Sequence, residues 1–319
     1  MTPALEAQSI TKKYRSAGQP EVVAVDAFSF TVAPGEIVGL LGPNGAGKTT
    51  AMQLALGLLE RDSGEVRAFG GDPEDLAARR RIGYAPDAPL FPKALTGLQI
   101  LELHASLSQL PKARAAQMVE ELGFAEPARR PFGTYSRGQA QRLGLAQALI
   151  GEPDLVLLDE PTAGLDPAGV RGMRELLTKL RARGAAVLLN SHLLSEIERV
   201  CDRVLFIKAG RLLRTHEVHA QGGRRAEVRL ANGSQVRERL LQKLPDGVLE
   251  QGRFLIPVAS EDVVPALVRQ LVEAGAEILE VSLGGAELEE LYVQIVEGRS
   301  PPGSSPQAAL VLAPPGARS

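Results

Sequence analysis

The chain has 319 residues, 44% of them hydrophobic, and a formal net charge of −2 at neutral pH. This length suggests about two domains, each with a hydrophobic core of its own. The balanced charge argues against a general nucleic-acid-binding protein, which usually carries an excess of basic residues. The single cysteine, Cys201, excludes an internal disulfide and a zinc cluster made of cysteines.

We expect neither a secretory signal nor a membrane span. Residues 1–10 lack a basic segment followed by an apolar one. Apolar runs such as 155–158 and 187–189 are much shorter than the roughly 18 residues that a membrane helix needs. If the protein works at a membrane, another chain is expected to supply the span.

The N-terminal segments predict antiparallel β-structure, with strands at residues 5–10 and 28–32. In the second strand apolar and polar residues alternate, as in a strand with one solvated face. Tyr14 follows the first strand within a basic run. Its ring could stack on a nucleotide base or pack at the solvent edge, and the spacing leaves both interpretations open.

A glycine-rich loop follows the apolar run 37–41 and precedes a segment, 51–59, with the pattern of a helix. This is the context that the phosphate-binding motif G-x-x-x-x-G-K-[ST] requires. The glycines let backbone N–H groups surround phosphates, whereas a Cβ at Gly45 or Gly47 would force the chain away. Lys48 reaches the β- and γ-phosphates, and the Thr49 hydroxyl can bind Mg²⁺. The predicted nucleoside triphosphate site comprises Gly42, Pro43, Asn44, Gly45, Ala46, Gly47, Lys48, Thr49 and Thr50.

The segment after the loop combines short strands with a helical insertion. Strands are predicted at 65–69 and 82–85, and the arginines at 79–81 are interpreted as a solvated helix end. From 96 to 124 the helical period dominates, with a break near residue 111. The next helix begins at Ser136, whose capping box with Gln139 favours an ordinary N-terminus over an anion site.

Two carboxylates follow the run 155–158, which has the pattern of a strand buried on both faces. Open α/β sheets bind ligands at this end of their strands. Asp159 is suited to hold Mg²⁺ through water and Glu160 to polarise an attacking water, and the alternative is that both acids cap the next turn. Asp166 is predicted as the N-cap of the following helix and could also serve the site. His192 lies directly past another buried strand, 185–189.

The pattern breaks at residues 221–223, where we place a domain boundary. The next elements are predicted in the β-α-β-β-α-β order of a ferredoxin-like unit, followed by a helix at 286–296. Residues 298–319 are rich in Pro, Gly, Ser and Ala and are expected to be a disordered tail. The predicted domains are therefore 1–222 and 225–297.

Taken in order, these motifs resemble those of the ATP-binding subunit of ABC transporters, over residues 5 to 221. They are 42–50 (Walker A), 135–139 (signature), 155–160 (Walker B), 163–166 (D-loop) and His192 (switch histidine). The residues 135–139 and 191–196 resemble the ABC-2 branch, which pairs with separate permeases, mostly for export. The resemblance implies an α/β P-loop NTPase cassette, with a mixed sheet core and antiparallel β and helical subdomains. The C-terminal α+β domain is similar to an accessory domain of such subunits.

The resemblance also implies a composite site. Two subunits would close head to tail, so that the signature residues Ser136, Gly138 and Gln139 of one face the γ-phosphate held by Lys48 of the other. Glu160 would be the general base. The resemblance further implies that Tyr14 stacks on adenine, His192 reaches the γ-phosphate and Asp166 contacts the partner subunit.

The cofactors implied by the resemblance are ATP and Mg²⁺, with Thr49, Asp87 and Asp159 toward the metal. The implied partners are an integral-membrane permease on a separate chain and a second copy of the subunit, with no nucleic acid. The permease's coupling helix would dock on the helical insertion and the loop after Pro86. This places the chain at the cytoplasmic face of the membrane.

Two positions depart from the family's pattern. The signature reads Tyr-Ser-Arg-Gly-Gln rather than Leu-Ser-Gly-Gly-Gln, so Arg137 brings a charge near the γ-phosphate. Asp87 stands where the family has a glutamine that binds Mg²⁺ and water and senses the permease. Aspartate can still bind Mg²⁺, but its side chain reaches less far.

Two other classes of protein are less compatible with the sequence. A soluble ABC-type ATPase acting on nucleic acid or ribosomes would show a long coiled coil between residues 50 and 135, a second cassette or zinc-binding cysteines. A nucleotide sensor without hydrolysis would not need Glu160 and His192, which are both present. The sequence therefore favours an ATPase that powers a separate permease.

Overall fold

The computed structural model describes residues 2–15, 18, 20–191, 194–218, 224–250, 253–258, 261–283, 288 and 291–293. His192, the predicted boundary at 221–223, most of the predicted helix at 286–296 and the tail at 298–319 lie outside the described residues. Within these ranges, no helix combines the length and apolarity that crossing a membrane takes.

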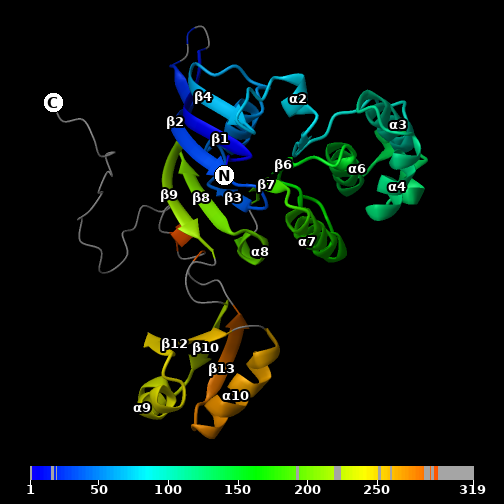
Figure 1. The fold of residues 1–319 in the computed structure, drawn as a ribbon. Helices are drawn as coiled ribbons and strands as arrows, with labels where there is room; N and C mark the ends of the chain where they lie inside the picture. The colour runs from blue at the N-terminus through cyan, green and yellow to red at the C-terminus, as the bar shows by residue number, and fades with distance from the viewer. Residues whose placement is uncertain are drawn as a thin grey trace, which may run out of the picture.

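A mixed sheet of six strands forms the centre of the fold, in the order β5-β6-β7-β3-β8-β9 (Figure 1). The first five strands in this order run parallel to one another, and β9 runs antiparallel to β8. The strands are β3 (Ile37–Leu41), β5 (Ile82–Ala85), β6 (Leu155–Asp159), β7 (Ala186–Asn190), β8 (Arg203–Lys208) and β9 (Arg211–Glu217).

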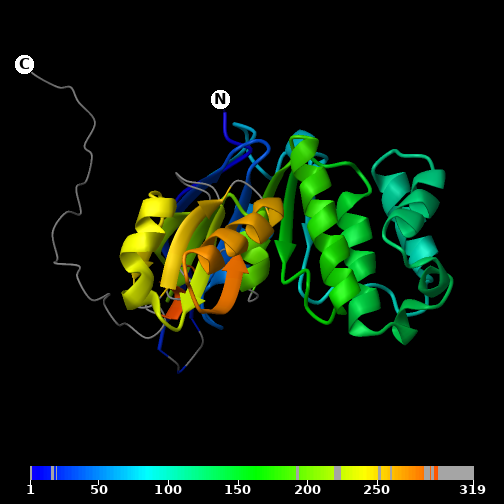
Figure 2. The ribbon, with the colours of Figure 1, turned by 90° about the horizontal axis from the view of Figure 1, so that it is seen from below.

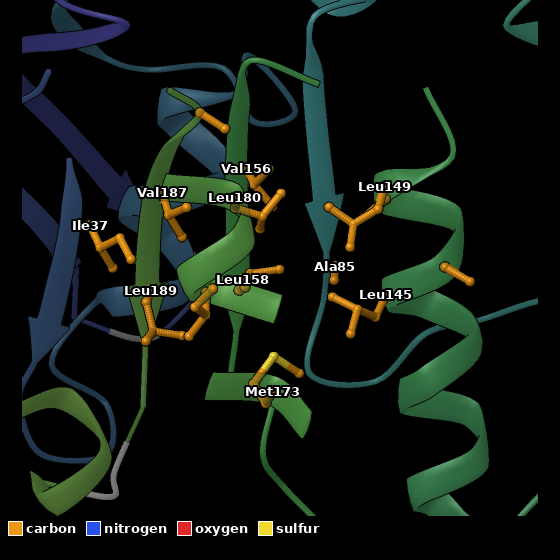
Figure 3. Close-up of a cluster of buried hydrophobic side chains, with 14 of the residues drawn as sticks. Ile37, Ala85, Leu145, Leu149, Val156, Leu158, Met173, Leu180, Val187 and Leu189 are labelled. Atoms are coloured by element: carbon orange, nitrogen blue, oxygen red, sulfur yellow. The ribbon is translucent and has the colours of Figure 1, made fainter. Parts of the chain in front are cut away.

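Both faces of the sheet are covered, which explains the unbroken apolar runs in the sequence. Because successive side chains point to opposite faces, Val156 and Leu158 of β6 join the core under the helices. Figure 3 shows them between neighbouring strands and the side chains of two helices, among them Leu145 and Met173. The alternate residue Leu157 joins the core on the other face.

The second face packs against helix α1 (Lys48–Ala55) and a three-stranded antiparallel sheet in the order β2-β1-β4. These strands are β1 (Leu5–Tyr14), β2 (Val22–Val32) and β4 (Ser63–Ala68). Met52 and Leu54 of α1 are fully buried in this core. The glycine-rich loop that leads into α1 is thereby held between two sheets.

The remaining helices of this part lie on the opposite side, as Figures 1 and 2 show for α3, α4, α6 and α7. They are α3 (Gly97–Leu107), α4 (Ala113–Glu121), α5 (Ala125–Ala128), α6 (Arg137–Leu149), α7 (Pro167–Ala182) and α8 (Leu194–Val200), whereas the short helix α2 (Leu76–Arg79) lies near β4 in Figure 1. The expected pair of helices within 96–124 is confirmed, with the break between Leu107 and Ala113.

Several boundaries differ from the sequence-based expectation. Helix α1 begins at Lys48 rather than at residue 51, because Gly47 in the left-handed conformation is its N-cap. The sequence predicts a strand at 204–207 and a hairpin turn at 209–211, and β9 returns after this turn to pair with β8, although its mostly exposed residues gave no bounds for it. The arginines at 79–81 are exposed at the end of α2, as expected, but Arg81 also makes two contacts. Its guanidinium lies 3.7 Å from the ring centroid of Phe69 and pairs with Asp154 at 2.7 Å.

The C-terminal region forms a separate four-stranded antiparallel sheet with a core of its own. The element order is β10 (Arg224–Leu230), α9 (Gly233–Lys243), β11 (Val248–Glu250), β12 (Arg253–Val258), α10 (Val264–Glu273) and β13 (Ile278–Leu283). The strand order β11-β12-β10-β13 places the first and third strands in the middle. Leu288 and Leu291, further along the chain, are buried with the core under the helices of the first sheet instead.

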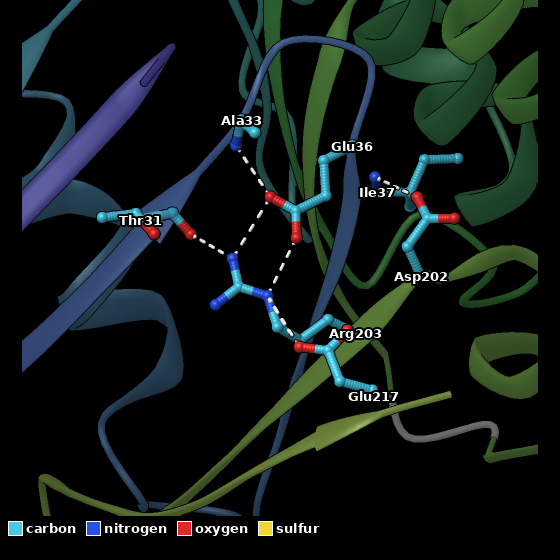
Figure 4. A network of polar contacts seen from close by, with 7 residues as sticks. All are labelled: Thr31, Ala33, Glu36, Ile37, Asp202, Arg203 and Glu217. Atoms are coloured by element: carbon cyan, nitrogen blue, oxygen red, sulfur yellow. Dashed lines mark hydrogen bonds and ion pairs between the residues drawn. The ribbon is translucent and has the colours of Figure 1, made fainter. Parts of the chain in front are cut away.

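A half-buried ion pair joins the two sheets of the first part at the end opposite to the glycine-rich loop (Figure 4). Arg203 of β8 donates twice to the Glu36 carboxylate, at 2.8 and 3.2 Å, and also to the Thr31 carbonyl of β2 at 2.8 Å. Glu36 accepts in addition from the backbone N–H of Ala33 at 2.7 Å. Paired donors on a planar carboxylate fix geometry as well as energy.

We expect Arg203→Gln to lower the free energy of unfolding by about 1–3 kcal/mol, because it leaves a half-buried carboxylate short of donors. Urea-induced unfolding followed by circular dichroism measures the change. Arg67→Gln is the matched control, since its pair with Glu65 is half-exposed on both sides and should contribute little. Equal losses in the two variants would contradict the role of the Arg203 pair.

Candidate functional site

The glycine-rich loop connects β3 to α1, and backbone packing explains two of its glycines. A Cβ at Gly47, where φ is +101°, would lie 2.2 Å from the carbonyl oxygen of Ala24 in β2. A Cβ at Gly42 would lie 2.1 Å from the carbonyl oxygen of Ile207 in β8. A Cβ at Gly45 would have no neighbour within 4 Å, although its φ of +78° still favours glycine. The loop shape is thus set by the strands beneath it, an effect that the motif alone did not reveal.

Lys48, the first residue of α1, points its amino group into this loop. Its Nζ donates to the carbonyl oxygens of Gly42 at 2.8 Å and Pro43 at 3.2 Å. Burial lowers the pKa of Lys48, and the charges of Glu160 and Asp159 act in the opposite direction. A half-desolvated cation aimed at the concave side of a loop is well placed to bind an anion.

The next residue, Thr49, connects the loop to the end of β6. Its hydroxyl donates to Asp159 Oδ2 at 2.7 Å. The other carboxylate oxygen of Asp159 accepts from the Asn190 side-chain amide at the end of β7. Register explains the contact, because Asp159 and Asn190 are direct partners in the parallel pair β6–β7. Sequence reasoning had not given Asn190 a role, although a polar residue that ends a buried strand was a usable signal.

Glu160 follows Asp159 in a conformation that non-glycine residues rarely adopt, with φ at +51°. The chain is held there by hydrogen bonds of the backbone. The N–H of Glu160 donates to the Asn190 carbonyl at 2.9 Å, and its own carbonyl accepts from the N–H of Ala163 at 3.0 Å. The buried Gln141 of α6 approaches the same carbonyl at 3.5 Å. Such strain is typical of functional sites.

Three buried polar atoms near these carboxylates have no hydrogen-bond partner among the described residues. They are Asn190 Oδ1, Gln141 Oε1 and Thr162 Oγ1. Buried polar groups are normally satisfied, so a cluster of exceptions indicates a place where water or a ligand completes the bonding. Together with the hydroxyl of Thr49 and the carboxylate of Asp159, the site offers the hard oxygen donors that Mg²⁺ prefers.

The capping box predicted at Ser136 is confirmed. Ser136 Oγ accepts from the N–H of Gln139 at 3.3 Å, and Gln139 Oε1 accepts from the N–H of Ser136 at 3.0 Å. The motif lies against the loop after Glu160, because a Cβ at Gly138 would approach the Gly164 carbonyl oxygen to 2.8 Å. The signature and D-loop segments are therefore neighbours within one chain.

The other predicted residues are more scattered. Asp166 is the N-cap of α7, as predicted, and accepts from the N–H of Gly169 at 2.9 Å. Tyr14 ends β1 with 44% of its surface exposed, and Lys12 Nζ lies 5.8 Å from its ring centroid. Asp87 does not contact Thr49 or Asp159 and instead pairs with Arg137 at 2.8 Å. His192 lies outside the described residues.

The comparisons with known proteins agree with this geometry. The ABC transporter family model matches residues 25–163. An uncharacterised ABC transporter ATP-binding protein of Nostoc sp. is 33% identical, over 93% of this chain and 91% of that protein. The fluoroquinolones export ATP-binding protein of Mycobacterium tuberculosis is 37% identical, over 66% of this chain and 70% of that one.

A solved structure supports the same assignment. It is a dimeric ATP-binding cassette in a post-hydrolysis state, bound to ADP and Pi. It superimposes with a TM-score of 0.63 at 25% identity, over 67% of this chain and 98% of that one. This chain belongs to the ATP-binding subunits of ABC transporters. As a member of that family it binds ATP and is an ATPase, and the cassette fold inferred from the motifs is confirmed.

We expect Gly47→Ala to destabilise this ABC subunit more than Gly45→Ala does. Both substitutions put alanine in a left-handed conformation, which costs about 1–2 kcal/mol, but only the first brings a Cβ against the backbone of β2. Urea unfolding without nucleotide measures the difference. If Gly45→Ala were equally destabilising, the contact with Ala24 would not be the reason for glycine at position 47.

Proposed function

We propose that two copies of this chain hydrolyse ATP at composite sites and power a separate membrane permease that exports its cargo. The observation that carries the proposal is the contact from Thr49 in the phosphate loop to Asp159 beside Glu160. The dimeric cassette with ADP and Pi supports a pair of subunits. In the proposal the two subunits close head to tail, with Ser136 and Gly138 of one opposite Lys48 of the other. The fluoroquinolones export relative supports the direction of transport.

Each residue has a distinct role in this proposal. The loop 42–50 and the Lys48 ammonium hold the phosphates, while Tyr14 stacks on the adenine. Glu160 takes a proton from water as the water oxygen bonds to the γ-phosphorus. The bond from that phosphorus to the β-phosphate oxygen breaks, which yields ADP and phosphate. His192 would orient the γ-phosphate, and Asp166 and Gln139 would contact the partner subunit.

Thr49 and Asp159 would hold a magnesium ion together with phosphate oxygens and water, and Asp87 would complete the set. Within the described residues, no group of three or more His, Cys, Asp or Glu side chains is placed to hold a metal. Magnesium often binds this way, through one or two carboxylates plus substrate phosphates. When bound, the ion neutralises charge on the β- and γ-phosphates.

A groove beside the site supports a permease partner of helical shape. It has a volume of about 340 Å³ and lies where the loop after β5 meets the end of α1, α2 and α6. Leu90 in this loop is 91% exposed, and Leu58 is 57% exposed. Exposed apolar side chains that rim a groove are typical of a docking site for an amphipathic helix. The lining includes Leu56, Leu58, Tyr84, Pro89, Leu90 and Phe91.

In this proposal the chain lies at the cytoplasmic face of the membrane, bound through the permease. The helix that fills the groove would belong to the permease. Binding there would act directly on the short segment between β5 and the helical insertion.

Glu160→Gln protein should form a dimer when ATP and Mg²⁺ are added and remain monomeric without them. Removal of the base blocks hydrolysis and traps the closed state, which size-exclusion chromatography with light scattering detects. Ser136→Arg in the same background should abolish the dimer, because it fills the proposed composite site. A wild-type monomer that hydrolysed ATP without dimerising would overturn the composite site.

Leu90→Glu should reduce the fraction of the chain bound to membranes of its own cells, while ATP binding in solution stays intact. The substitution introduces a desolvation cost where an apolar helix would dock. Leu213→Glu is the matched control, since Leu213 is 50% exposed on β9, away from the helical insertion, and does not line the groove. Equal membrane binding of both variants and wild type would argue against this groove as the permease site.

A further inference from the structure

The two positions at which the sequence departs from the ABC pattern lie in contact. Arg137, the arginine of the signature, places Nη2 2.8 Å from Oδ1 of Asp87, in the loop after β5. The residues are separated by 50 positions in the chain, so the contact reflects the packing of the signature helix against this loop. The positive charge of Arg137 is thus paired with the negative charge of Asp87.

Asp87 follows β5 at the edge of the sheet where the nucleotide site lies. Strand β5 runs parallel to β6, with Ala85 opposite Leu158, so both strands end side by side. Asp87 comes two residues after Ala85, just as Glu160 comes two residues after Leu158. Burial, together with the charges of Asp159 and Asp87, raises the pKa of Tyr84 to about 12. Both carboxylates therefore act on one side chain at this edge.

Arg137 is held on its other side by the D-loop. A Cβ at Gly164 would lie 3.3 Å from both Cγ and Cδ of Arg137, so the arginine stem passes directly over this glycine. Gly164 has a φ of +75°, where a larger residue would be strained. This contact directs the aliphatic part of the Arg137 side chain toward Asp87. The ion pair itself is exposed, because 64% of the Arg137 side-chain surface and 44% of the Asp87 side-chain surface remain accessible to solvent. Exposed pairs of this kind are weak and exchange readily.

We propose that Arg137 competes with magnesium for the Asp87 carboxylate. The guanidinium holds the Asp87 carboxylate, and binding of magnesium with nucleotide requires Asp87 to leave Arg137. The released guanidinium then remains in the signature, where it can pair with a phosphate oxygen. Arg137 is a positioning residue in this scheme, and the proposal rests on the proposed magnesium role of Asp87.

The test is the gain in nucleotide affinity that magnesium provides. A fluorescent, non-hydrolysable ATP analogue is titrated in excess magnesium and in EDTA, at protein concentrations where light scattering shows a monomer. Arg137→Gln should increase the ratio of the two dissociation constants by about two- to five-fold, the range expected for loss of an exposed ion pair. The affinity in EDTA should stay the same, because the competition requires the metal.

Two further variants make the result specific. In an Asp87→Asn background, Arg137→Gln should leave the ratio unchanged, because the competing pair is already gone. Arg142→Gln, on the same helix but paired with Asp166 at 3.5 Å, should match wild type. If Arg137→Gln leaves the ratio unchanged or lowers it, the competition is wrong. If wild-type protein gains no affinity from magnesium, the proposed magnesium site fails instead.

Discussion

The contact among Thr49, Asp159 and Asn190 is the constraint on which the rest of the site depends. It joins the phosphate loop to the ends of two neighbouring parallel strands. A carboxylate at 1% exposure is costly unless its oxygens accept hydrogen bonds, and here each oxygen accepts one. The strand ends, the start of α1 and the turn at Glu160 are therefore fixed relative to one another before any nucleotide binds.

The same constraint explains why Glu160 tolerates its left-handed backbone. The strand β6 ends at Asp159, and the chain must turn at once to reach the D-loop and α7. Hydrogen bonds from Glu160 to Asn190 and from Ala163 to Glu160 stabilise that turn. The hydrogen bonds that hold this strained backbone also fix where the Glu160 side chain leaves the chain. A fixed starting point suits its proposed role as a base that must face one water molecule.

Much of the fold could be predicted, because buried parallel strands leave long apolar runs and the phosphate loop has a strict spacing. Strand β5 and the break between α3 and α4 match the expected positions. The turn at 209–211 indicated a hairpin, but the extent of the exposed strand β9 could not be given, because pairing with β8 rather than burial defines it. The pair of Arg137 with Asp87 was equally hidden. Each residue was recognised alone, but only the packing of a helix on a distant loop brings the two charges together.

The loop after β5 lines the groove and also pairs with the signature helix, so in the proposed mechanism it connects the groove to the nucleotide site. Pro86, Pro89 and Leu90 line the groove, while Asp87 between them pairs with the signature. The loop has two states in this mechanism, one with Asp87 paired to Arg137 and one with Asp87 released. A partner helix in the groove can change the nucleotide site only if its affinity for these two states differs. Breaking the exposed ion pair accounts for only a few-fold difference between the two affinities. A stronger coupling would have to come from the apolar contacts of Leu90 and its neighbours, which are large enough to favour one loop position over the other.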